Sequence, residues 1–279
     1  MPIEPKQELK LFLTVAVCTR NQAQLLTRAV ASVLPQLGPD TELLIVDNAS
    51  TDETPQVIAA LAANNPVIRL CQEATPGIPF ARNAALLNAR GRHILFFDHD
   101  ELVEPGWLDA YRSFLKNPPT SKLGCVGGPY LAQPEAPVPA WLDPHYGSYR
   151  LATATGKLVG GSTPANGNCA YPTELAVRMG GFHPEIPRQS DTELNLRLRQ
   201  AGYELWWLES ARVRHIIPAS RLRFKAQARL WRQEGRDSAV LRWLLRRTRT
   251  RRLALCAGRC LAAVPQLILQ FAGSVVLGL

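Results

Sequence analysis

Hydrophobic positions alternate between two spacings along the first hundred residues, and this alternation predicts strands separated by helices. Leu11 to Val17 is an apolar, β-branched run typical of a strand, and apolar pairs three or four residues apart follow it, as in a helix. The expected strands are 11–17, 42–46, 67–70 and 93–97, and the expected helices are 22–34, 53–63 and 78–89. This βαβαβαβ order predicts a mainly parallel, Rossmann-like sheet flanked by helices, with ligand-binding residues at the carboxyl ends of the strands.

The pattern is looser after Glu101 but continues to about Pro218. A helix is expected over 105–116, a glycine-rich strand over 124–130, a helix over 192–201 and a strand over 203–208. The proline-rich residues 133–144 between them predict a loop or lid. We therefore expect one domain over 9–220, with a first half of 9–101 and a second of 102–220.

The last sixty residues have a different character. Arg221 to Arg252 has the pattern of a basic amphipathic helix, and about twenty uncharged residues, 260–279, follow it. That length matches a bilayer span. Pro265, Gln266 and Gln270 interrupt it, so an interfacial hairpin and packing against the preceding domain stay open. We expect 221–279 to form a membrane-associating tail and, because its arginines precede the apolar stretch, the domain to lie in the cytoplasm, peripheral or tail-anchored.

The composition of the chain indicates the charge of its partner and its cellular compartment. The chain of 279 residues has a formal net charge of +9, which indicates an anionic partner such as a nucleotide, a nucleic acid or a membrane. Its six cysteines have no paired CxxC arrangement, and the charged start, Met1 to Lys10, does not resemble a signal peptide. Both observations favour reduced thiols and a cytosolic location.

Polar residues stand at the carboxyl ends of three expected strands. Thr19, Arg20 and Asn21 follow the first strand, Asp47 the second, and the stretch Asp98 to Asp100 the fourth. Because parallel strands end at one edge of a sheet, these side chains are expected to converge. Asp98 and Asp100 could both turn toward one Mg²⁺ or Mn²⁺ ion, which favours oxygen ligands, although a solvated turn at the sheet rim explains an isolated DxD equally well.

The motifs gain specificity from their order and spacing. The sequence contains VAVCTRN at 15–21, LLIVDNASTDET at 43–54, GIPFARNAAL at 77–86 and ILFFDHDE at 94–101. Its second half contains NGNCAYPTELAVRMGGFHPE at 166–185, SDTELNLRLRQAGYELWW at 190–207 and ARVRHIIP at 211–218. Over residues 9–220 the chain resembles the family 2 glycosyltransferases of GT-A fold.

The resemblance implies a set of donor-binding residues. Asp47 would hold the nucleotide base, and Thr19 and Arg20 would lie near the nucleoside. Arg82, one turn into its helix, would bind the diphosphate with its planar guanidinium. Asp98 would also contact the nucleotide-sugar donor. The donor implied is a nucleotide sugar, most simply a UDP sugar.

The resemblance also implies a metal site and a base. Asp98 and Asp100 would be the metal-binding motif for Mn²⁺ or Mg²⁺, with His215 as a third ligand. Asp191 would be the general base of an inverting transfer.

One position departs from the family pattern. Ser190 stands where relatives usually have Glu, although Asp191 is kept, and a contribution from Glu193 stays open.

The expected acceptor is a polysaccharide or a lipid-linked glycan, inferred from the membrane-like tail. Small residues in GSTPANGN, 161–168, would let it approach closely, and Trp141 is either an acceptor contact or a packing residue. A nucleotidyltransferase that makes nucleotide sugars is an alternative, but CTRNQAQ lacks its glycine-rich, basic loop. A nucleic-acid-binding module leaves the ordered acids unexplained, so we expect no nucleic-acid partner.

Overall fold

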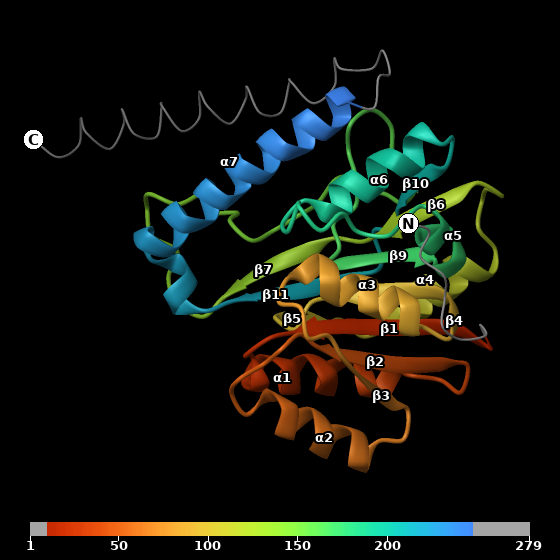
Figure 1. Ribbon diagram of the computed structural model, residues 1–279, viewed down its shortest axis with the longest axis horizontal. Coiled ribbons are helices and arrows are strands. Elements are labelled where there is room, and N and C mark those ends of the chain that lie inside the picture. Colours follow the sequence, from red (N-terminus) through yellow and green to blue (C-terminus); the bar gives the residue numbers. More distant parts are fainter. Residues whose placement is uncertain (1–9, 248–279) are drawn as a thin grey trace, which may run out of the picture.

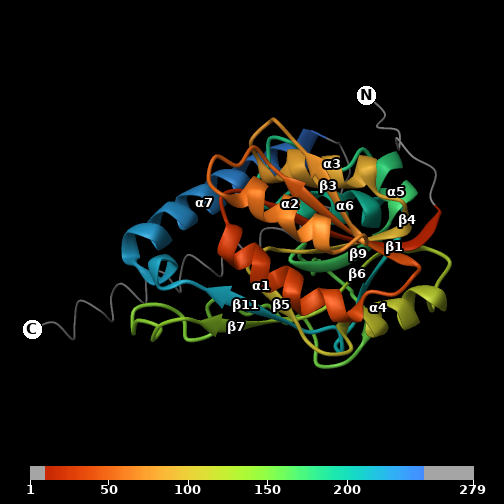
Figure 2. The same ribbon diagram turned by 90° about the horizontal axis from the view of Figure 1, so that it is seen from below.

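An eight-stranded sheet forms the centre of the molecule (Figures 1 and 2). The computed structural model describes residues 10–247. The four expected strands are present and parallel, in the order β3-β2-β1-β4. Their bounds are Leu11–Thr19 for β1, Thr41–Asp47 for β2, Ile68–Gln72 for β3 and Gly91–Phe97 for β4.

The second half of the chain extends the same sheet beyond β4. Strand β9 is antiparallel to both β4 and β6, and β10 is parallel to β6. The strands are β6 (Leu123–Gly127), β8 (Gly156–Lys157), β9 (Asn168–Pro172) and β10 (Glu204–Trp207). The prediction of an α/β fold built on a Rossmann-like sheet is thus confirmed, and the antiparallel β9 joins the two halves.

A separate three-stranded sheet corrects one sequence prediction. The single strand expected over 124–130 is wrong, because the chain leaves the main sheet after β6 and re-forms as β7 (Tyr130–Pro134). Strand β7 pairs with β11 (Val213–Ile217), which also pairs with β5 (Glu101–Val103). A Cβ at Gly128 would lie 2.0 Å from the Ala211 carbonyl oxygen, so only glycine fits at this crossing.

Helices cover both faces of the main sheet. One face packs against α1 (Ala23–Val33), α2 (Thr54–Asn64) and α4 (Trp107–Lys116). The other packs against α3 (Ile78–Asn88), α5 (Thr173–Arg178) and α6 (Ser190–Gln200). A short 3₁₀ turn, η1 (Leu34–Gln36), follows α1. Both faces are therefore dry, which explains why β1 and β2 have continuous apolar runs.

Asn168 is a buried polar link between the layers. Its side-chain oxygen accepts hydrogen bonds from Trp107 Nε1 at 2.8 Å and from the Tyr111 hydroxyl at 2.9 Å. Its amide nitrogen donates to the carbonyls of Pro129 and Ala211. Asn168 is fully buried, so these bonds offset the desolvation of its amide and fix α4 against the crossing between the two sheets.

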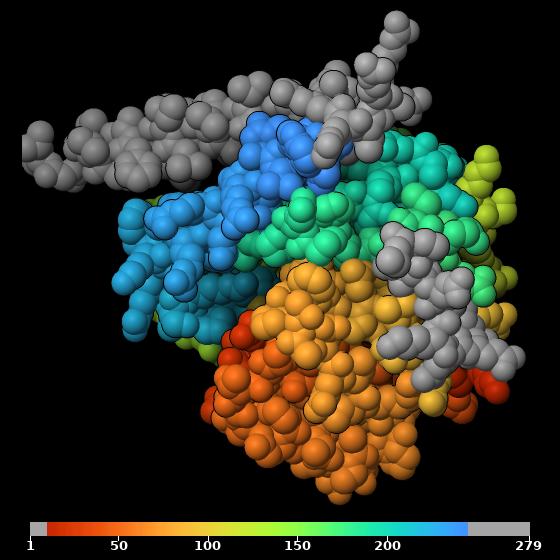
Figure 3. All heavy atoms as spheres, viewed as in Figure 1, coloured from red at the N-terminus to blue at the C-terminus, as the bar shows by residue number. Residues whose placement is uncertain are grey.

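The C-terminal helix packs against the domain instead of standing apart from it. A short turn, η2 (Ala219–Leu222), leads into α7 (Phe224–Arg247), which crosses the molecule diagonally (Figure 1). In Figure 3 its blue surface is continuous with the green surface of the α6 region. Trp141, one candidate for an acceptor contact, packs its ring 5.5 Å from Phe224 and 6.4 Å from Trp231.

The apolar stretch expected to contact a membrane, 260–279, lies outside the described residues. Among residues 10–247, no helix combines the length and the hydropathy that crossing a bilayer requires.

Candidate functional site

Two strand ends place the expected nucleoside-binding residues together. Thr19 and Asp47 are the last residues of β1 and β2 and face each other in the strand register. Both are buried, and the Thr19 hydroxyl has no hydrogen-bond partner among the described residues. Asp47 Oδ1 accepts the Ser50 N–H at 3.2 Å, whereas Arg20 is exposed at the rim. This edge therefore presents a carboxylate and an unused hydroxyl.

Asn48 fixes the segment that leads to Arg82. Its side-chain oxygen accepts the Gly77 N–H at 2.7 Å, and its amide nitrogen donates to the carbonyls of Glu73 and Thr75. Gly77 has φ of 142°, a conformation that favours glycine. These bonds tie the end of β2 to the first turn of α3, which carries Arg82.

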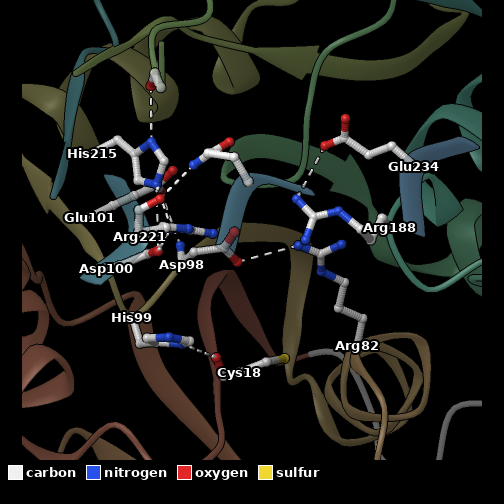
Figure 4. Close-up of polar contacts among 12 residues, drawn as sticks. Cys18, Arg82, Asp98, His99, Asp100, Glu101, Arg188, His215, Arg221 and Glu234 are labelled. Atoms are coloured by element: carbon white, nitrogen blue, oxygen red, sulfur yellow. Dashed lines mark hydrogen bonds and ion pairs between the residues drawn. The ribbon is translucent and has the colours of Figure 1, made fainter. Parts of the chain in front are cut away.

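Arg82 brings its charge to the end of β4 from a buried position. Its side chain is 8% exposed, and Nη2 lies 3.3 Å from Asp98 Oδ1 (Figure 4). Burial lowers the pKa of Arg82, but the charges of Asp98 and Asp191 outweigh burial and raise it. A permanent cation thus lies within the electrostatic reach of both acids, with a planar fork of donors suited to phosphate.

Asp100 does not share the Arg82 contact but pairs with a different arginine. Arg221 Nη1 donates to Asp100 Oδ2 at 2.8 Å and lies 3.2 Å from His215 Nε2 (Figure 4). His215 Nε2 is 3.5 Å from the same carboxylate oxygen. Burial raises the pKa of Asp100, but His215, His99 and Arg221 outweigh it and hold that pKa well below its usual range.

His99 and His215, the two histidines of the site, contact different backbone carbonyls. His99, between the two acids, contacts the Cys18 carbonyl oxygen at 3.1 Å through Nδ1, as expected for a side chain that points away from a shared ion. His215 Nδ1 contacts the Gly147 carbonyl oxygen at 2.9 Å. Burial lowers the pKa of His215, and the neighbouring Asp100 raises it by more.

Glu101 is a functional candidate to which the sequence assigned no role. It is 3% exposed, and its Oε2 accepts the Asp98 N–H at 3.0 Å. Burial and the charges of Asp98 and Asp100 raise its pKa well above the usual range. Its contact with the Asp98 backbone shapes the turn that presents both aspartates.

Asp191 lies at the first turn of α6, held by backbone donors. Its Oδ2 accepts the Asn166 N–H at 2.9 Å and its Oδ1 accepts the Thr192 N–H at 2.7 Å. The side-chain nitrogen of the same Asn166 is buried and has no partner among the described residues. Asp191 is 8% exposed, and its carboxylate is oriented by one backbone donor of the GSTPANGN segment and one of α6.

The two residues flanking the expected base differ in their surroundings. The Ser190 hydroxyl is buried and unpartnered within the described chain. Glu193 forms two 2.7 Å hydrogen bonds with Arg197, one turn along α6. Arg197 also donates to the carbonyls of Met179 and Gly181, so Glu193 belongs to a structural ion pair.

The donor chemistry at Asp98, Asp100 and His215 fits Mn²⁺ or Mg²⁺, but their arrangement does not form a complete site. Two carboxylates and an imidazole are suitable ligands, and the carbonyl at Nδ1 of His215 is the support that metal-binding histidines commonly have. Over residues 10–247, however, no three His, Cys, Asp or Glu side chains are grouped to hold a metal ion. Arg82 and Arg221 instead contact the two aspartates.

Comparison with known proteins gives the family. Residues 14–152 match the family model "Glycosyl transferase family 2". A chondroitin synthase of Pasteurella multocida is 34% identical over 128 residues, covering 45% of this chain and 13% of the relative. The succinoglycan biosynthesis protein ExoO of Rhizobium meliloti is 38% identical over 97 residues, covering 34% and 27%. The chain thus matches only 13% and 27% of the lengths of these two relatives.

Solved structures share the fold. The mannosyltransferase PcManGT of Pyrobaculum calidifontis, in complex with GDP-Man and Mn²⁺, has a TM-score of 0.59 at 18% identity, covering 99% of this chain and 84% of that one. S. aureus TarS 1-349 in complex with UDP has a TM-score of 0.55 at 20% identity, covering 74% and 61%. At these identities the likeness establishes the fold alone.

Proposed function

The chain belongs to glycosyl transferase family 2, and we propose that it transfers a sugar from a nucleotide-sugar donor, a UDP sugar, to a polysaccharide or lipid-linked glycan. The observation that carries this proposal is the set of polar groups at the carboxyl ends of β1, β2 and β4. Thr19 and Asp47 lie side by side there. Asp98 and the buried Arg82 lie at the end of β4.

The donor would be bound by groups of matching chemistry. Asp47 can accept hydrogen bonds from the base, and Thr19 has an unused hydroxyl for the nucleoside. Arg20 lies at the exposed rim beside them. Arg82 would pair with the diphosphate through two parallel hydrogen bonds, for which its fork is preorganised.

The reaction proposed is a single displacement with inversion. Asp191 removes the proton from the acceptor hydroxyl while that oxygen attacks the anomeric carbon and the bond from that carbon to the diphosphate oxygen breaks. Backbone donors at Asn166 and Thr192 orient the Asp191 carboxylate for this role. General-base catalysis of this kind contributes roughly 10² to 10⁴ in rate.

Asp98, Asp100 and His215 would hold the Mn²⁺ or Mg²⁺. The chemistry that such an ion supplies is neutralisation of the charge that develops on the leaving diphosphate. Arg82 contributes to the same end with a fixed guanidinium.

The acceptor side is proposed from the surface of α7. Lys225, Arg229, Arg232 and Arg236 are all exposed, and their spacings of four, three and four residues place them along one face. We call these four residues the basic stripe. Such a face favours contact with the anionic cytoplasmic surface of a membrane, where lipid-linked acceptors are held.

A panel of nucleotide sugars tests the proposal directly. Thermal unfolding of the full chain is recorded with each UDP and GDP sugar, in Mn²⁺ and in a chelator, and hydrolysis without acceptor is followed in parallel. One UDP sugar with Mn²⁺ should raise Tm, since a ligand at 100 times its Kd stabilises by about 2.7 kcal/mol. Arg82→Gln should weaken this protection, whereas the control Arg178→Gln, an exposed residue on α5, should not. A panel in which no nucleotide sugar protects the chain or is hydrolysed would contradict the function.

A further inference from the structure

A protein cation contacts two of the three expected metal ligands. Arg221 Nη1 lies 2.8 Å from Asp100 Oδ2 and 3.2 Å from His215 Nε2 (Figure 4). The side chains of Asp100 and His215 are only 13% and 16% exposed, so this contact is shielded from solvent. Arg221 is thus a shared cationic partner of Asp100 and His215.

The hydrogen-bond chemistry of His215 makes the contact exclusive. A carbonyl oxygen only accepts, so the contact with Gly147 places the ring proton of neutral His215 on Nδ1. Nε2 then has one lone pair, and a guanidinium, which has donors and no acceptor, must use it. Because a metal ion would need that same lone pair, Nε2 can bind Arg221 or a metal, but not both together.

Arg221 is held at its backbone, whereas its guanidinium is attached by a flexible side chain. Its N–H donates to Pro218 O at 2.9 Å, and its carbonyl accepts from Gln227 Nε2 on α7 at 2.5 Å. Leu222, the next residue, is buried in a cluster with Leu142 and Ile217. The guanidinium can therefore leave Asp100 by side-chain rotation, with η2 and α7 in place.

We propose that Arg221 is a positioning residue that occupies Asp100 and His215 until a divalent metal displaces it. The inference rests on the metal site of the proposed function. It explains how His215 and Asp100 lie 3.5 Å apart, near enough to share an ion, while the described residues form no complete metal site. Its consequence is that metal binding must break the Arg221 contacts, which weakens the affinity of the chain for metal alone.

The test is Mn²⁺ binding at pH 8 without nucleotide, followed by the electron paramagnetic resonance signal of free Mn²⁺. Arg221→Gln should bind Mn²⁺ at least about tenfold more tightly than the natural chain, because a hydrogen bond between charged groups, worth about 1.5–3 kcal/mol, no longer has to be broken. Arg223→Gln removes an exposed arginine two residues away and should leave the affinity unchanged. Unfolding curves establish that both variants are folded.

The outcomes separate this inference from the function on which it rests. Equal or weaker Mn²⁺ binding by Arg221→Gln, in a protein whose natural chain binds Mn²⁺ with UDP, overturns the role of Arg221 alone. If neither chain binds Mn²⁺ even with UDP present, the metal assignment is wrong and this inference fails with it. Tighter binding by both arginine variants would point to general loss of positive charge and would also overturn it.

Discussion

The two acids at the start of α6 differ in the groups that hold their carboxylates. Both oxygens of Asp191 accept backbone N–H groups, which orients the carboxylate but leaves lone pairs for a proton. Glu193 is also bonded at both oxygens, but its partner is the Arg197 guanidinium, so action as a base would break an ion pair. The donors at Asp191 are neutral backbone groups, and this difference supports the proposal of Asp191 as the base.

Replacing these acids one at a time separates the base from its neighbour. Asp191→Asn should lower the transfer rate by about 10² to 10⁴ while leaving UDP affinity nearly unchanged. Glu193→Gln should lower stability through Arg197 but keep most of the transfer rate per folded molecule. Initial rates, UDP titrations and unfolding curves are measured on both variants. Equal loss of UDP affinity and rate in Asp191→Asn would remove its role as base.

Local sequence predicted the residues at strand ends and missed those brought in by distant segments. Thr19 and Asp47 lie together because two buried parallel strands end at the same level. The apolar runs in the sequence predict where both strands end. Arg221 lies 121 positions from Asp100 and begins an arginine-rich stretch, so nothing in the sequence distinguishes it from the arginines that follow. No local pattern reports that a guanidinium turns back toward an acid.

At the scale of elements, strong periodicity predicted the strands and helices of the first half to within a few residues. Strands β5, β7, β8, β9 and β11 were not predicted. β9, with the sequence NCAYP, has no β-branched residue, and it is extended because β4 and β6 pair with it on either side. Tertiary pairing there outweighs intrinsic propensity.

Helix α7 is attached to the domain along one side by apolar and polar contacts. Trp231 packs against Trp141 and Phe224. Asp237 Oδ2 accepts the Arg188 N–H at 2.7 Å, and Glu234 lies 3.4 Å from the Arg188 guanidinium. The acidic residues of α7 thus face the domain.

Two tryptophans on α7 test this attachment. Trp231→Ala should destabilise the chain by about 2 kcal/mol, below the value for a fully buried tryptophan because its side chain is only partly buried. Trp243→Ala, at a residue that is 51% exposed, is the matched control and should cost much less. Denaturant unfolding measures both. Similar losses for the two variants would mean that the ring cluster does not hold α7.

At the scale of the whole molecule, charge is distributed unevenly. The net charge of +9 is not spread over the surface, because the basic stripe follows α7 on the side away from Asp237 and Glu234. Over the eleven residue steps from Lys225 to Arg236, an α-helix rises about 17 Å. The sequence predicted a basic helix as part of a membrane-associating tail, and in the fold α7 lies against the domain.

The stripe should bind anionic bilayers without help from the apolar end of the chain. We expect the chain truncated after Arg252 to bind phosphatidylserine vesicles, and replacement of three stripe arginines by glutamine to weaken this binding by roughly 10²-fold, at about 1 kcal/mol for each cation. The arginines are Arg229, Arg232 and Arg236.

The matched control replaces three exposed cations elsewhere: Arg92, Lys116 and Arg178. Vesicle sedimentation at low and high salt measures both, and only the stripe variant should lose the salt-dependent part of binding. A truncated chain that stays in the supernatant would contradict the stripe, and one that sediments as fully as the complete chain would refute an anchor at 253–279.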